Sequence, residues 1–126
     1  MVEMAAVAAD EALPRVSADR PIDLVHLARM TFGDRSLERE VLGLFDRQAC
    51  LLIARMKQLG TPAIPGLAHT LKGSARGIGA RQVAQAAEEV ERAAALGADE
   101  VLSALTALEL ATDEARAAIA DLLRVS

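Results

Sequence analysis

The chain has 126 residues, of which 52% are apolar and 25% are charged, and its formal net charge is −4. This length fits one domain with a single core, and Ala and Leu dominate the apolar residues, which favours helix. With two Phe, no Tyr or Trp and no basic excess, the composition argues against a nucleic-acid-binding module. No apolar run approaches the roughly 20 residues that span a bilayer, so we expect no membrane association.

The N-terminal stretch MVEMAAVAADEALPRVSADR lacks the basic start and apolar centre of a secretory signal. We expect residues 1–20 to form a flexible tail and residues 21–126 to form the folded domain. The lone Cys50 has no partner for an intramolecular disulfide, which fits a reducing compartment. We therefore expect a cytoplasmic protein in which Cys50 is a small buried core residue.

Capping residues divide residues 21–60 into two predicted helices. Asp23 is suited to cap a short helix that ends near Gly33. Asp34 or Ser36 then begins a long helix, for which Gly60 is the natural end. Apolar residues recur along this long helix at three- and four-residue spacing, with polar interruptions, which predicts that they face the core: Leu37, Val41, Leu44, Leu51 and Leu59.

Three further helices are predicted after residue 60. The first begins at Thr61–Pro62, with a start blurred by Pro65, and ends between Gly77 and Gly79. The second runs from about Arg81 to Leu96 and buries Val83, Ala86, Ala87 and Val90. Asp99 is suited to cap the third helix, which carries a regular apolar seam of Val101, Leu105, Leu108, Thr112, Ala115, Ile119 and Leu122. Short loops and the absence of a strand pattern predict an all-α antiparallel four-helix bundle with a short additional N-terminal helix.

The segment LAHTLKGSARGIGA, residues 67–80, places unusual residues on one side of a helix. At about 100° per residue, its apolar positions cluster opposite His69, Lys72, Gly73, Arg76 and Gly77. Glycine costs about 1 kcal/mol inside a helix, and here neither Gly73 nor Gly77 faces the core. Their effect is to clear space around the imidazole, beside which Lys72 and Arg76 place two cations. From the residues alone, an anion or phosphate site and an ordinary solvated histidine face both remain open.

This segment resembles the signature of histidine-containing phosphotransfer (HPt) domains, the carrier modules of multi-step phosphorelays. The matching residues are Ala68, His69, Leu71, Lys72, Gly73, Ser74 and Gly79. The resemblance extends over residues 21–123. GDRSLEREVLGLF is similar to the family's second-helix pattern, and VER at residues 90–92 is similar to the Leu-Glu pair on its following helix.

The resemblance implies a role for each residue of this face. His69 would accept a phosphoryl group from the phospho-aspartate of a receiver domain, or from a hybrid histidine kinase, and would pass it to a response regulator. The nucleophile has to be a neutral imidazole, because an imidazolium has no free lone pair. Glu91 would hydrogen-bond the other ring nitrogen and orient the ring, Lys72 and Arg76 would offset the phosphoryl charge, and Gly73 and Gly77 would give the partner access.

The resemblance also implies a phosphoryl carrier rather than an enzyme, since the chain has no nucleotide-binding glycine loop. We expect no cofactor in this chain, with Mg²⁺ supplied by the partner receiver domain. The expected partners are response-regulator receivers and a sensor or hybrid histidine kinase, and we expect a monomer.

Other interpretations of these residues are weaker. In the phospho-acceptor domain of a histidine kinase, an acidic residue and then a Pro typically follow the histidine, whereas Thr70, Leu71 and Lys72 follow here. A bundle that binds a receiver without being phosphorylated remains an alternative. Glu88 and Glu91 could form a hydrolytic pair, but carboxylates three residues apart usually form a solvated helix face. His26 is expected at the surface or rim, with a place in the partner-binding surface as the alternative, and the chain has too few Cys and His residues for a zinc site.

Overall fold

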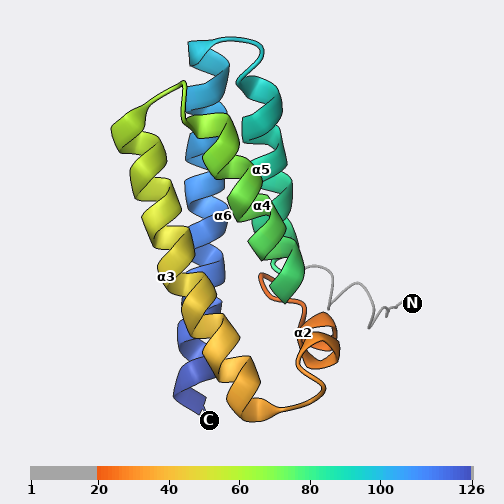
Figure 1. Ribbon diagram of the computed structural model, residues 1–126. Coiled ribbons are helices and arrows are strands. Elements are labelled where there is room, and N and C mark those ends of the chain that lie inside the picture. The colour runs from red at the N-terminus through yellow and green to blue at the C-terminus, as the bar shows by residue number, and fades with distance from the viewer. Residues whose placement is uncertain (1–19, 126) are drawn as a thin grey trace, which may run out of the picture.

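The computed structural model describes residues 20–125, which form an all-α bundle with no strand in that range (Figure 1). Its helices, in chain order, are α2 (Leu24–Met30), α3 (Arg35–Leu59), α4 (Ile64–Ile78), α5 (Arg81–Ala93) and α6 (Ala98–Val125). Helix α4 packs against α3 and α5, and α6 packs against the same two helices. The short α2 lies beside the C-terminal end of α4. The predicted bundle with a short additional N-terminal helix is confirmed, while the predicted tail lies outside the described residues except for Arg20.

The residues predicted to start and stop helices act as expected at four positions. The carboxylates of Asp23 and Asp34 each accept a hydrogen bond from the amide three residues further on, at 3.1 and 3.0 Å. These bonds satisfy amides that a helix start leaves unpaired. Helix α3 ends at Gly60 (φ +78°) and α4 ends at Gly79 (φ +82°), where glycine accepts a positive φ without strain.

The start of α4 differs from the prediction. Thr61–Pro62 was expected to begin this helix, but residues 61–63 form a turn and the helix begins at Ile64. Pro65 lies in the first helical turn, where the missing amide hydrogen costs nothing. The second proline of the segment therefore marks the helix start.

The boundary between α5 and α6 also differs. Helix α5 ends at Ala93 rather than at Leu96, because the amides of Leu96 and Gly97 both bond to the Ala93 carbonyl and tighten the chain into a turn. Helix α6 begins at Ala98, so Asp99 lies inside its first turn and is not the cap. The carboxylate still lies near the positive end of the helix dipole.

The prediction that one apolar stripe of α3 faces the core is wrong for three of its leucines. Leu44, Leu51 and Leu59 are each more than half exposed, and Leu37 and Val41 are half-buried. The bundle buries a different stripe, spaced three and four residues apart without a polar interruption: Leu42, Phe45, Ala49, Leu52 and Met56. Gln48 and Arg55 interrupt the predicted stripe, and burying an arginine without a partner costs more than exposing a leucine.

Cys50 was expected in the core, and this prediction is also wrong. Its side chain is exposed. Cys50 follows Ala49, which is fully buried, and a step of one residue turns a helix by about 100°. The thiol therefore lies on the outer side of α3.

Helices α5 and α6 bury most of the residues that their spacing predicts. Val83, Ala87 and Val90 of α5 are buried together with Ala84, whereas Ala86 is half-buried. Along α6 every predicted seam residue is buried except Leu122, which is half-buried. The buried side chains of these helices, spaced three or four residues apart, thus belong to one continuous core.

Small side chains line the contact between α4 and α5. Ala68 and Ala75 of α4 and Ala87 of α5 have no exposed surface, and Ala84 is almost fully buried. Small residues at a helix contact let the two backbones approach closely. The connection is also short, since only Gly79 and Ala80 separate α4 from α5. These features hold the facing side chains of the two helices within reach of each other.

Gly79 also joins α2 to the bundle. Its carbonyl accepts a hydrogen bond from the Asp23 amide at 2.8 Å, and Nε2 of His26 lies 3.1 Å from the carbonyl oxygen of Gly77. A Cβ atom at Gly79 would lie 3.0 Å from the carbonyl oxygen of Asp23. This position therefore requires glycine both for its positive φ and for the close approach of α2.

We expect Gly79→Ala to lower the free energy of unfolding by about 1–2 kcal/mol, because alanine is strained at positive φ. Gly73→Ala is the matched control. Gly73 lies inside α4, and a Cβ there would meet no heavy atom within 4 Å. It should raise the free energy of unfolding by about 0.5–1 kcal/mol. Urea denaturation of the full chain measures both, and equal stability of the two variants would contradict this account of Gly79.

Candidate functional site

His69 lies in the middle of α4 with its side chain 70% exposed. On the opposite side of the helix, Leu71 and Ala75 are fully buried, and Leu67 and Ile78 are half-buried. The helical spacing predicted this separation, and it is confirmed. The ring is therefore presented to solvent by a helix whose other face is held in the core.

Glu91 of α5 contacts the His69 ring. Oε2 of Glu91 lies 2.9 Å from Nδ1 of His69. An ionised carboxylate only accepts hydrogen bonds. In the neutral ring, Nδ1 therefore carries the proton and its N–H donates a hydrogen bond to Oε2. Nε2 then carries the free lone pair. The sequence resemblance pointed to Glu91 for this position, and the structure places it there.

Lys72 also contacts Glu91. Its Nζ lies 2.6 Å from Oε1 of Glu91, and its side chain is only 14% exposed. The Lys72 ammonium at this distance is the main reason that the pKa of the Glu91 carboxyl lies below its ordinary value; the hydrogen bond from His69 adds to this effect and burial opposes it. Glu91 is therefore held in its ionised form.

The position of Lys72 differs from the sequence prediction, which placed it on the solvent-facing side of α4. Its Cα does lie near that side, but the flexible side chain turns toward α5 and reaches the carboxylate there. Helical spacing describes the direction of Cβ and not the end of a four-carbon chain. Once Glu91 was assigned to His69, the position of Lys72 three residues later could have revealed this contact.

Arg76 is the more accessible of the two predicted cations. Its side chain is 59% exposed, and its guanidinium lies 3.9 Å from Glu88. Glu88 is shared with Arg92, whose guanidinium lies 3.6 Å away. Arg76 is thus only loosely held, one turn of α4 beyond Lys72.

The packing around Gly73 and Gly77 does not require glycine at either position. A Cβ atom at either position would meet no heavy atom within 4 Å. Each glycine instead lowers the surface beside the cations of α4. The carbonyl of Gly77 also contacts His26, which joins this part of α4 to α2.

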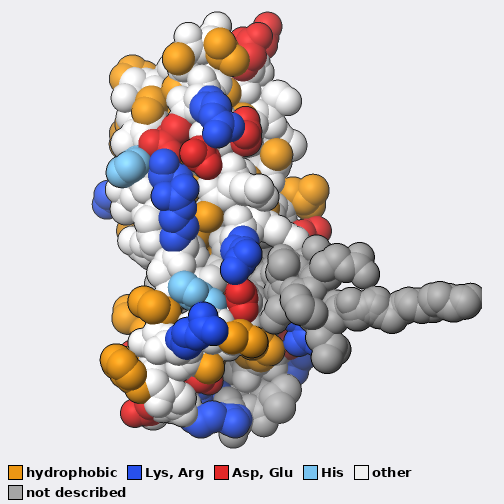
Figure 2. Space-filling model, turned by 90° about the vertical axis from the view of Figure 1, so that its right-hand side faces the viewer, with side chains coloured by type: hydrophobic (Ala, Val, Ile, Leu, Met, Phe, Trp, Pro, Cys, Tyr) orange, Lys and Arg blue, Asp and Glu red, His pale blue; other side chains and the backbone are white. Residues whose placement is uncertain are grey.

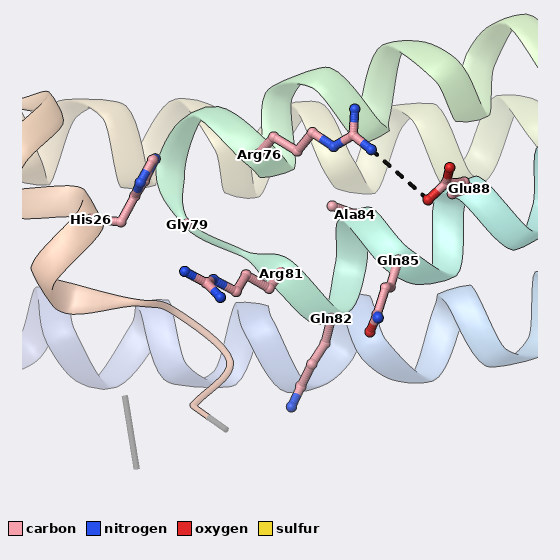
Figure 3. Close-up of a pocket in the computed structure, with 8 residues that line it drawn as sticks. All are labelled: His26, Arg76, Gly79, Arg81, Gln82, Ala84, Gln85 and Glu88. Atoms are coloured by element: carbon pink, nitrogen blue, oxygen red, sulfur yellow. Dashed lines mark ion pairs between the residues drawn. The ribbon is translucent and has the colours of Figure 1, made fainter. Parts of the chain in front are cut away.

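A hollow of about 480 Å³ adjoins this face (Figure 3). Its walls include His26 of α2, Arg76 of α4, and Arg81 and Glu88 of α5. Figure 3 shows Arg76 reaching across toward Glu88, while His26 approaches from α2. His26, expected at the surface or rim, is half-buried at this edge. Figure 2 shows both histidines on one side of the molecule with Lys and Arg side chains beside them.

Neither a group of metal-ligating side chains nor a helix that could span a bilayer occurs among the described residues. Within residues 20–125, no three His, Cys, Asp or Glu side chains are grouped closely enough to hold a metal ion. Over the same range, no helix has the length and apolar character needed to cross a bilayer.

Comparison with known proteins agrees with this geometry. A family model described as "Hpt domain" matches residues 40–123, two thirds of the chain, including His69 and Glu91. No curated protein and no solved structure matched the chain. Hpt domains are phosphoryl carriers in phosphorelay signalling. The match covers most of the bundle and the whole of the site, and it shows that this chain belongs to the Hpt domain family.

Proposed function

We propose that His69 accepts a phosphoryl group on Nε2 from the phospho-aspartate of a receiver domain, or from a hybrid histidine kinase, and transfers it to a response regulator. One observation carries this proposal: Glu91 contacts Nδ1 of an imidazole that is otherwise exposed. Within the neutral ring, that contact selects the tautomer with its proton on Nδ1 and its lone pair on Nε2, which is the form that attacks phosphorus.

The transfer step makes use of the same contact. The Nε2 lone pair forms a bond to phosphorus while the bond from phosphorus to the aspartyl oxygen breaks, and its electron pair leaves with the aspartate. The ring keeps its Nδ1 proton and becomes positively charged. The Glu91 carboxylate, 2.9 Å from Nδ1, stabilises this charge. Transfer to the next aspartate reverses these bond changes and restores the neutral ring.

The surrounding residues favour the approach of the donor. Arg76, exposed and loosely paired, supplies positive charge near the phosphoryl oxygens, and Lys72 adds to this potential from its place beside Glu91. Gly73 and Gly77 leave space for the partner's active site. We propose that Mg²⁺ is held by the partner receiver and that this chain contributes no cofactor.

The proposed partners are receiver domains and a sensor or hybrid histidine kinase. We further propose that the chain works as a cytoplasmic monomer. Its lone cysteine has no partner within the chain for a disulfide, which favours a reducing compartment.

Phosphorylation is expected to require His69. The full chain, incubated with a panel of receiver domains phosphorylated by acetyl phosphate, should gain a phosphate that is labile in acid and stable in base. His69→Gln should abolish this gain, because it removes the nucleophile. His26→Gln is the matched control and should retain it. Receiver binding by the wild-type chain without any such phosphate would favour the non-phosphorylated scaffold instead.

Replacing Gly73 should hinder the approach of a receiver domain without changing the reactivity of the His69 ring. Gly73→Leu should slow transfer from a receiver by tenfold or more (on the order of 1.4 kcal/mol), because the new side chain occupies the approach path. Phosphorylation by phosphoramidate, a donor too small to need docking, should be nearly unchanged. Gly43→Leu in α3 is the matched control, since a Cβ there meets only Arg47. An equal loss with both donors would contradict the proposed role of Gly73.

Substitution of Glu91 should distinguish ring orientation from a direct chemical role. Glu91→Ala should slow transfer, because Nδ1 loses its acceptor. Glu91→Gln should retain more activity, since its amide oxygen accepts the same N–H. Rates from single-turnover transfer at one pH provide the comparison. If Glu91→Ala is as inactive as His69→Gln while its circular dichroism spectrum remains native, the carboxylate takes part in bond making and the assigned role is wrong.

A further inference from the structure

The carboxylate of Glu91 contacts two side chains of α4, His69 and Lys72. Oε2 contacts Nδ1 of His69 at 2.9 Å, and Oε1 contacts Nζ of Lys72 at 2.6 Å. The two contacts differ in their surroundings, since the His69 side chain is largely exposed and Lys72 is only 14% exposed. Lys72 is therefore directed toward α5 and away from solvent.

The Lys72 ammonium contacts the carboxylate that binds Nδ1 of the ring, and no contact of Lys72 with the ring itself accompanies it. Lys72 is bound to the carboxylate that faces Nδ1, whereas the phosphoryl donor arrives at Nε2. In the structure its charge acts first on the carboxylate.

An uncompensated negative charge on Glu91 lowers the fraction of His69 rings that can react. A carboxylate beside an imidazole stabilises the imidazolium, which has no lone pair for attack. A cation on the same carboxylate opposes this stabilisation. Glu91 carries such a cation at a shorter distance than the ring itself.

We propose that Lys72 is a positioning residue that compensates the charge of Glu91, so that Glu91 orients the His69 ring without converting it to the imidazolium. The inference rests on the proposed function of His69 as phosphoryl acceptor. It assigns Lys72 a role in the unphosphorylated protein that differs from binding the phosphoryl group.

The other charged groups on this side of the molecule are further along the helices. Arg76 of α4 and Glu88 of α5 pair with each other one turn beyond, and Glu88 also pairs with Arg92. Helix α2 contributes His26, which contacts Gly77. On α3, which packs against α4, Asp46 and Lys57 pair with residues of α6 instead. Among these ion pairs, the pair of Lys72 and Glu91 is thus the one that contacts the His69 ring.

The direct test is the titration of the His69 imidazole, followed by NMR of its ring nitrogens and carbon-bound protons in the full chain. Lys72→Met should move the titration midpoint upward, because Glu91 is then uncompensated. The double variant Lys72→Met with Glu91→Gln should bring it back toward the wild-type midpoint, and Lys72→Arg should preserve it. Lys57→Met is the matched control, since Lys57 and Glu109 form another pair at 2.6 Å on α3 and α6.

The rate of phosphorylation provides a second readout. With phosphoramidate at about pH 6, Lys72→Met should be slower than wild type by about two- to fivefold, the effect of a partly exposed charge. The loss should diminish at about pH 8, because raising the pH increases the neutral fraction of the ring more in the variant whose midpoint is raised. Loss of a direct phosphoryl contact would instead slow the reaction by the same factor at both pH values.

An unchanged midpoint in Lys72→Met, together with a pH-independent loss of rate, would overturn the inference and assign Lys72 to the phosphoryl group. A raised midpoint that persists in the double variant would also overturn it, because the effect would not depend on Glu91. Failure of the proposed function is a different result. In that case wild-type protein gains no phosphate from any donor, whereas the titration still reports on the charge balance.

Discussion

The close packing of α4 against α5 is the constraint on which the rest of the site depends. Alanines at the contact let the helices approach, and the two-residue connection through Gly79 and Ala80 leaves little freedom in their relative register. His69 precedes Gly79 by ten residues and Glu91 follows it by twelve. At about 1.5 Å per residue these are helix lengths of about 15 and 18 Å, so the two side chains come nearly level. The carboxylate can then reach both His69 and Lys72.

This arrangement combines an exposed ring with a defined orientation. The core holds α4 by its opposite face, and a hydrogen bond to a neighbouring helix orients the largely exposed imidazole. Such a ring remains open to a large partner while its tautomer is selected. Gly73 and Gly77 extend the open area, and the hollow lined by Arg76, Arg81 and His26 continues it toward α2. A carrier that meets several proteins in turn needs this combination, because each partner has to reach the same nitrogen.

Glycine has two unrelated functions in this chain. At Gly79 the backbone has a positive φ, and a Cβ atom there would lie only 3.0 Å from the carbonyl oxygen of Asp23. At Gly73 the backbone is ordinary helix and the surrounding space is empty. The first glycine belongs to the fold, since it joins α2 to the turn between α4 and α5. The second weakens the helix slightly and leaves room beside His69.

Much of the fold and part of the site could be predicted from the sequence because they depend on neighbours in the chain. A cap such as Asp23 bonds an amide three residues away, and the exposed position of His69 follows from the apolar residues on the other side of the same helix. The assignment of Glu91 to the ring also came from the sequence, but through resemblance to a family, because its separation of 22 residues from His69 carries no local signal.

Two features were decided only by the tertiary structure. Helix α3 has two apolar stripes, and the stripe through Ala49 is buried because the other, through Leu44 and Leu51, contains polar positions that the core would have to accommodate. Lys72 has a Cα near the solvent-facing side and an ammonium beside Glu91, because a long side chain follows the nearest opposite charge. The sequence by itself determined where α2, α3 and α5 begin and which way His69 faces, since these features are set within one or two turns. The tertiary structure decided which stripe of α3 is buried and which charge Lys72 meets, since both depend on residues that only packing brings together.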